Sequence, residues 1–194
     1  MLKRIEQKKA RRKKFYIGAI LVFLMIISML GILLGNDGGA QFEYNKFKFE
    51  VENNLLVTKI NGEKKTFRFL PQELLSIKTP ADLKQTLKEP MMVLTFDPGV
   101  GVQNLIYLDL IRKDFSDSFD SFVQSGITNQ SELYNMPLVN CDNATQSIPV
   151  IYFNLSNETS ITKDDYCTVF NGQTIVFLKL RDLTLYIYYG VING

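Results

Sequence analysis

The sequence predicts a mixed α/β protein, in which an N-terminal transmembrane helix is followed by one extracytosolic domain with helices packed on a mixed, largely antiparallel sheet. Three observations support this prediction. An uncharged run of 21 residues, 15–35, follows a strongly basic N-terminus. Residues 42–70 carry the signals of antiparallel hairpins. Segments of strand and helix character then alternate toward the C-terminus.

The uncharged run has the length of a membrane-spanning helix. At about 1.5 Å per residue it would extend roughly 31 Å, close to the ~30 Å hydrocarbon core of a bilayer. The first 14 residues carry eight Lys and Arg against one acid, Glu6. Since positive flanks stay in the cytoplasm, residues 36–194 are expected outside the cell membrane. Cleavage of a signal peptide after Ala40 is the alternative.

The predicted organisation is therefore a basic cytoplasmic tail (1–14), a transmembrane signal anchor (15–35), a short linker (36–41) and one domain (42–194). Gly31 and Gly35 form a small-x-x-x-small pattern inside the anchor, which is typical of helix association and would allow oligomers. Outside the tail, the remaining basic and acidic residues leave a net charge of about −5. The tail is thus expected to meet the lipid bilayer, and nucleic acid is not an expected partner.

Cys141 and Cys167 both fall on the expected outer side, where an even cysteine count favours a disulfide. Two unrelated buried thiols are the alternative. No metal or cofactor is expected, because the chain has no histidine and no Cys-x-x-Cys motif. Four Asn-x-Ser/Thr motifs predict glycosylation in a host that modifies asparagine, and they begin at Asn129, Asn143, Asn154 and Asn157.

Residues 42–70 predict a three-stranded antiparallel opening. Aromatic alternation over residues 42–51 indicates the first strand, with a slip of one residue near Asn45. Asn53-Asn54 and the dipeptide Asn61-Gly62 predict the two turns. A helical turn over residues 71–75 follows. The next helix is expected to have Thr79 as its N-cap and Pro80 at its first position.

The apolar run 91–96 predicts a buried strand. Apolar residues at three- and four-residue spacing then predict a helix from Val102 that stops at Gly126, with a break near Ser116. A loop is expected over 127–147, a strand over 148–155 and a turn at Asn171-Gly172. Residues 173–192 fit two readings: strands with a hairpin turn at Arg181-Asp182, or one helix capped by Gly190.

The segment Asp97-Pro98-Gly99-Val100-Gly101 is the candidate ligand loop. It follows the expected buried strand and precedes a helix, so Asp97, Gly99 and Gly101 could meet an anion, a cation or a sugar hydroxyl. The structural alternative is an ordinary strand-to-helix turn. The acids of the following helix could share a cation or form its solvated face; they are Asp109, Asp114, Asp117 and Asp120.

The absence of histidine removes the Ser-His-Asp and Cys-His nucleophile systems, so no catalytic residue is assigned and an enzyme is not expected. The sequence instead favours a membrane-anchored module that binds or scaffolds an envelope protein or glycan. Two alternatives remain open. One is an envelope hydrolase that works through paired carboxylates, and the other is an accessory subunit of a membrane complex.

Overall fold

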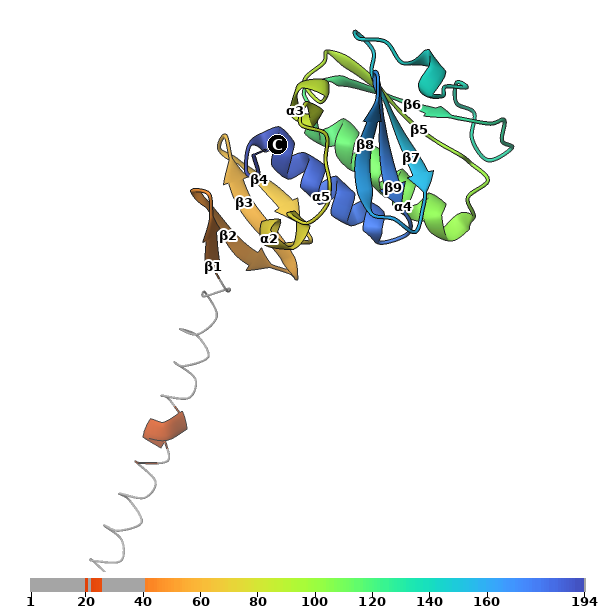
Figure 1. The fold of residues 1–194 in the computed structure, drawn as a ribbon. Helices are drawn as coiled ribbons and strands as arrows, with labels where there is room; N and C mark the ends of the chain where they lie inside the picture. Colours follow the sequence, from red (N-terminus) through yellow and green to blue (C-terminus); the bar gives the residue numbers. More distant parts are fainter. Residues whose placement is uncertain (1–19, 21, 26–40, 194) are drawn as a thin grey trace, which may run out of the picture. The chain divides into compact units, whose positions relative to one another are not determined.

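The computed structural model describes residue 20, residues 22–25 and residues 41–193, and the chain divides into two units, Met1–Gln41 and Phe42–Gly194 (Figure 1). In the first unit, Ile20 and residues 22–25 are helical and exposed. The expected tail, the rest of the expected anchor with Gly31 and Gly35, and the linker up to Ala40 lie outside the described residues. Within the described ranges, no helix has the length and apolar character needed to cross a bilayer.

The second unit has a mixed α/β fold with two sheets, and its first part is a four-stranded antiparallel meander. Its strands follow one another in the order β1 (Gln41–Tyr44), β2 (Phe47–Glu52), β3 (Leu55–Ile60) and β4 (Glu63–Phe67). Three two-residue turns join them, and both residues of each turn have positive φ, as tight hairpins require. The expectation of three strands was therefore wrong. The apparent slip near Asn45 is itself a hairpin turn, at Asn45-Lys46.

Two short helices, α2 (Pro71–Leu74) and α3 (Leu83–Thr86), follow the meander. The expected cap at Thr79 is wrong, because α3 begins after Asp82 and has no side-chain cap. The Asp82 carboxylate instead pairs with Lys163 on a distant strand. Leu83 and Leu87 both lie in the core with no exposed surface, as their spacing on one helix face predicts.

The second sheet has five strands: β5 (Met91–Phe96), β6 (Phe122–Ile127), β7 (Val150–Leu155), β8 (Ser160–Asp164) and β9 (Cys167–Gly172). Their spatial order is β6-β5-β7-β9-β8, and only β8 runs antiparallel to its neighbour. The expectation of one largely antiparallel sheet is thus corrected: the antiparallel meander is separate, and the sheet that carries the long helices is mostly parallel.

Helix α4 (Val102–Ser118) joins β5 to β6 and ends earlier than its apolar spacing predicts. Phe119 is already extended, and Phe122–Ile127 pairs with β5 along its whole length. From Phe122 onward the backbone groups are hydrogen-bonded to β5, so strand pairing overrides the helical spacing of the apolar residues. The expected turn at Asn171-Gly172 is also wrong, since both residues belong to β9.

The open question about residues 173–192 is resolved as a helix, α5 (Val176–Tyr189), which Gly190 ends in the left-handed conformation. Arg181 and Asp182 lie inside this helix rather than in a turn. Helices α4 and α5 cover the same face of the five-stranded sheet (Figure 1). Helix α5 also contacts the meander, where the Tyr186 ring stacks on Phe67 with centroids 4.1 Å apart. The aromatic core is therefore continuous from the meander to the larger sheet.

Candidate functional site

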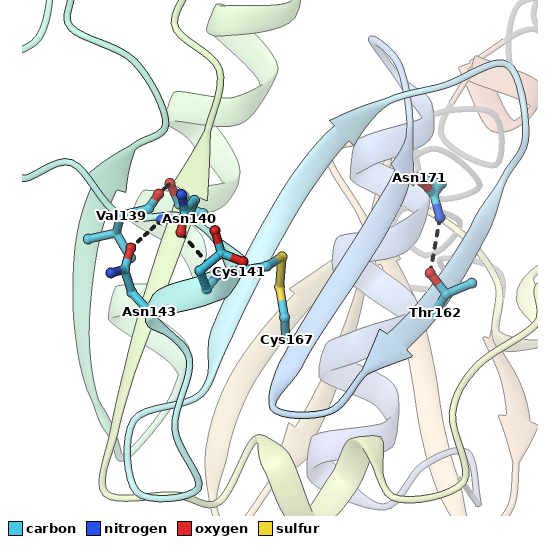
Figure 2. Close-up of a disulfide and its surroundings, with 9 residues drawn as sticks. Val139, Asn140, Cys141, Asn143, Thr162, Cys167 and Asn171 are labelled. Carbon is cyan, nitrogen blue, oxygen red and sulfur yellow. Dashed lines mark hydrogen bonds between the residues drawn. A yellow bond between two sulfur atoms is a disulfide. The ribbon is translucent and has the colours of Figure 1, made fainter.

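The second face of the five-stranded sheet is covered on one half by the loop between β6 and β7. Val93 and Val150 are buried beneath this loop, and the Thr95 hydroxyl donates a hydrogen bond of 2.6 Å to the Val139 carbonyl oxygen. The predicted disulfide between Cys141 and Cys167 is confirmed, and Figure 2 shows it joining the loop to β9. The loop thus covers the sheet face that a second layer of helices covers in a doubly wound fold.

A second contact holds the other end of this loop against α4. The Tyr134 hydroxyl donates to the Asp109 carboxylate at 2.9 Å. The Arg112 guanidinium lies 4.9 Å from the Phe96 ring centroid and 5.7 Å from that of Tyr134. Burial raises the pKa of the Tyr134 phenol, and its hydrogen bond to Asp109 raises it further. Tyr134 is therefore expected to remain a neutral hydrogen-bond donor at physiological pH.

The four asparagines of the glycosylation motifs have different surroundings. Asn129, Asn143 and Asn157 are exposed in loops or in a short 3₁₀ turn. Asn154 is half-buried in the central strand β7, and its amide nitrogen donates to the Asn171 side-chain oxygen at 2.8 Å. The Asn171 amide in turn donates to Thr162, as Figure 2 shows, and to Ser160. These side chains form a polar row on the uncovered half of the face.

The candidate ligand loop lies at the carboxyl end of β5, beside the point where the strand order reverses between β5 and β7. Asp97 is half-buried, and its carboxylate accepts a hydrogen bond of 2.8 Å from the Gly99 backbone N–H. Gly101 has φ of +82° and precedes the first residue of α4, a conformation that favours glycine. These contacts are those of an ordinary strand-to-helix turn, the structural alternative to a ligand loop. Binding by Asp97, Gly99 and Gly101 stays a prediction.

The acids of α4 are divided among different cations. Asp109 pairs with Arg112 at 2.5 Å, Asp117 with Lys113, and Asp114 lies 3.1 Å from the Arg181 side chain. In the portion of the chain that the structure describes, no cluster of three or more acidic, cysteine or histidine residues could hold a metal ion. The three acids on α4 therefore serve separate ion pairs, and Asp120, which was expected on the same helix, lies beyond its end at Ser118.

A concave site lies where the β3–β4 turn, the chain before β5 and the ends of α4 and α5 meet. We call it the tyrosine groove. It has a volume of about 590 Å³. Its lining residues are Ile60, Asn61, Glu63, Lys65, Lys88, Pro90, Ser118, Asp120, Ser121, Tyr188 and Tyr189. Ligand sites commonly have volumes of about 300–1,000 Å³, so the groove can hold a small molecule or a segment of a polymer.

Hydrogen bonds fix the two tyrosines of the groove. The Tyr188 hydroxyl accepts from the Asp120 N–H and donates to the Asp120 carboxylate, both at 3.0 Å. The Tyr189 hydroxyl donates to the Ser118 carbonyl oxygen at 3.1 Å. Burial is the main cause that raises the pKa of Tyr188. Both rings are thus held at the ends of the long helices, with their orientation set before any ligand arrives.

The charged side chains of the groove are balanced. Lys65 pairs with Glu63 at 2.8 Å, and this hydrogen bond raises the pKa of the Lys65 ammonium. The same ammonium lies 5.5 Å from the Tyr189 ring centroid. With Lys88 and Asp120, the lining holds two basic and two acidic residues. Sequence reasoning missed this site because four segments between residues 60 and 189 build it and no single segment carries a motif.

Comparison with protein-family models, with curated proteins and with solved structures finds no match to this chain.

Proposed function

We propose that residues 42–194 form an extracytosolic binding module, displayed from the cell membrane by the N-terminal anchor, whose ligand site is the tyrosine groove. The observation that carries the proposal is the groove itself, a concave site with two pre-oriented tyrosines and several polar side chains. The basic N-terminus, the apolar run 15–35 and the disulfide support the location in the cell envelope.

Binding is favoured over catalysis by the state of the groove carboxylates. Glu63 is paired with Lys65, and Asp120 is hydrogen-bonded to Tyr188. A glycosidase-type mechanism needs one carboxyl group as an acid and another as a base or nucleophile, whereas both groove carboxylates already bind protein groups. One observation does favour hydrolysis as a second candidate: both carboxylates line the same groove. Cleavage of a bound glycan by the full chain, lost in Asp120→Asn, would establish that alternative.

Hydroxyl-radical footprinting tests the binding proposal without a known ligand. We compare the full chain in isolated cell envelopes with the full chain purified in detergent. If an envelope component occupies the groove, oxidation of Tyr189 should fall at least threefold in envelopes. Tyr166, an exposed tyrosine outside the groove lining, serves as the internal control and should be oxidised equally in both samples. Equal oxidation of Tyr189 in the two samples would contradict a ligand in the groove.

The proposed location needs a separate measurement. A membrane-impermeant amine reagent should label the exposed Lys59 in intact cells. Labelling of Lys59 only after lysis would place residues 42–194 on the cytoplasmic side and remove the envelope from the proposal.

A further inference from the structure

We infer that the tyrosine groove takes an uncharged, hydroxyl-rich ligand, a segment of a neutral glycan, and this inference rests on the proposed binding function. Three features of the lining point to this chemical class. They are its charge balance, the presence of hydrogen-bond donors next to acceptors, and the small apolar surfaces between them. The first gives ions no advantage, the second matches hydroxyl groups, and the third argues against a peptide with apolar side chains.

The two basic and two acidic side chains of the groove cancel, so they give no net attraction to an ion of either sign. Helices α4 and α5 end at Ser118 and Tyr189, so the partial negative charge of two helix C-termini lies at the groove. An anionic ligand would meet these ends, and only Lys88 could pair with it without competition, since Glu63 already holds Lys65. A cationic ligand would meet Lys65 and Lys88. A neutral ligand avoids both costs, since it displaces no ion pair and brings no charge to be desolvated.

The polar groups left for a ligand include both donors and acceptors. In the described chain, no hydrogen-bond or ion-pair partner is found for the side chains of Asn61 and Lys88 at the groove wall. The Asn61 amide can donate and accept, and the Lys88 ammonium donates. The Asp120 carboxylate adds acceptor capacity beyond its bond to Tyr188. A hydroxyl group also donates and accepts at once, so a ligand with several hydroxyls can satisfy this mixture.

Apolar surface lies between these polar groups. The Tyr188 and Tyr189 ring centroids are 5.2 Å apart at an interplanar angle of 63°, and Pro90 and Ile60 complete the lining. Sugar rings present C–H groups on their faces and hydroxyls at their rims, which matches small apolar surfaces surrounded by donors and acceptors. A peptide with apolar side chains would find too little apolar surface here, because polar atoms contribute most of the groove lining.

The test measures binding of the full chain in detergent to an array of neutral and anionic oligosaccharides. At least one neutral oligosaccharide should bind, and Tyr189→Leu should weaken its binding at least tenfold. Tyr166→Leu is the matched control, because Tyr166 lies outside the groove lining, and it should change binding less than twofold. Asn61→Gly should weaken binding several-fold without disturbing the fold, since glycine keeps the positive φ of 52° in this turn.

The outcomes separate the ligand class from the binding function. If only anionic oligosaccharides bind, and Tyr189→Leu abolishes that binding, the neutral class is wrong while the groove remains the binding site. If no oligosaccharide binds although Tyr189 is protected in envelopes, the ligand is not a glycan. Neutral binding that Tyr189→Leu and Tyr166→Leu weaken equally would remove the groove from the interaction. A thermal melt of each variant verifies that it is folded.

Discussion

Arg181 and Asp182, neighbours in helix α5, form an ion pair of 2.6 Å between side chains that are 7% and 0% exposed. Asp182 also accepts hydrogen bonds from the backbone N–H groups of Arg68 and Phe69, at 2.6 and 3.0 Å. Arg181 donates to the Thr66 carbonyl oxygen at 2.9 Å. The pair therefore binds the end of the meander to the helix that packs on the larger sheet. Burial raises the pKa of Asp182 and outweighs the opposing effect of Arg181.

Replacing Asp182 should destabilise the protein strongly. Asp182→Ala leaves the Arg181 charge buried without its main partner and two backbone N–H groups without an acceptor. Removing one partner of a buried pair costs about 3–5 kcal/mol. Asp117→Ala is the matched control, because Asp117 pairs with Lys113 on the solvent side of α4 and should cost less than about 1 kcal/mol. Urea denaturation measures both, and equal effects would contradict a central role for the buried pair.

Tyr186 should make the fold sensitive to alkaline pH. Its side chain is fully buried, and its hydroxyl donates to the Phe69 carbonyl oxygen at 2.9 Å. Burial raises the pKa of Tyr186 far above its ordinary value of 10.0. Above pH 10 the unfolded chain therefore ionises first, so the stability that neutral Tyr186 contributes is lost as pH rises. The unfolding free energy of Tyr186→Phe, measured by urea denaturation, should fall less steeply above pH 10 than that of the wild type. An equally steep fall in both proteins would contradict a role for Tyr186 in the alkaline loss of stability.

The disulfide should determine whether the loop between β6 and β7 stays on the sheet. Cys141→Ala should lower the unfolding free energy by about 2–5 kcal/mol, a usual cost of losing a native disulfide. Limited proteolysis should then cut within residues 139–149, whereas residues near Tyr134 stay protected by the contacts to Asp109 and Arg112. Non-reducing peptide mapping of the wild type should recover Cys141 linked to Cys167. Recovery of two freely alkylated thiols would refute the linkage.

If the host glycosylates asparagine, the four motifs should not be used equally. Asn129, Asn143 and Asn157 are exposed and should be the occupied sites. Asn154 should remain unmodified in the folded chain, because its amide nitrogen is hydrogen-bonded to Asn171 within the sheet. Mass spectrometry of native protein gives the occupancy of each site. A glycan on Asn154 would show that modification precedes formation of β7 and would contradict the expectation that Asn154 stays unmodified.

Asp97 is expected to act in the turn and not in binding. Asp97→Ala removes the hydrogen bond from the Gly99 N–H, which should cost about 0.5–1.5 kcal/mol. Affinity for any ligand of the tyrosine groove should stay unchanged. Thermal melting combined with the oligosaccharide array measures both quantities. Lost binding at unchanged stability would instead support the ligand loop that Asp97, Gly99 and Gly101 suggest in the sequence.

Much of the local structure follows from the sequence. The turn residues at 53–54 and 61–62 predict two of the hairpins, since asparagine and glycine tolerate positive φ. The apolar run 91–96 predicts a strand buried on both faces. Cysteine number and expected location predict the disulfide. These features depend on short stretches of chain, in which each residue type has a direct conformational or chemical preference.

The sequence by itself thus determined the mixed α/β class, the early hairpins and the disulfide, whereas only the tertiary structure decided the rest. Phe122 continues a helical pattern but begins a strand, because β5 offers it backbone partners. Residues 176–189 suit strand or helix, and burial between two sheets decides for the helix. The tyrosine groove likewise depends on contacts between segments that are far apart in the sequence. Asn61, Lys88, Asp120 and Tyr189 meet only after folding, so no local pattern of side chains could encode their proximity.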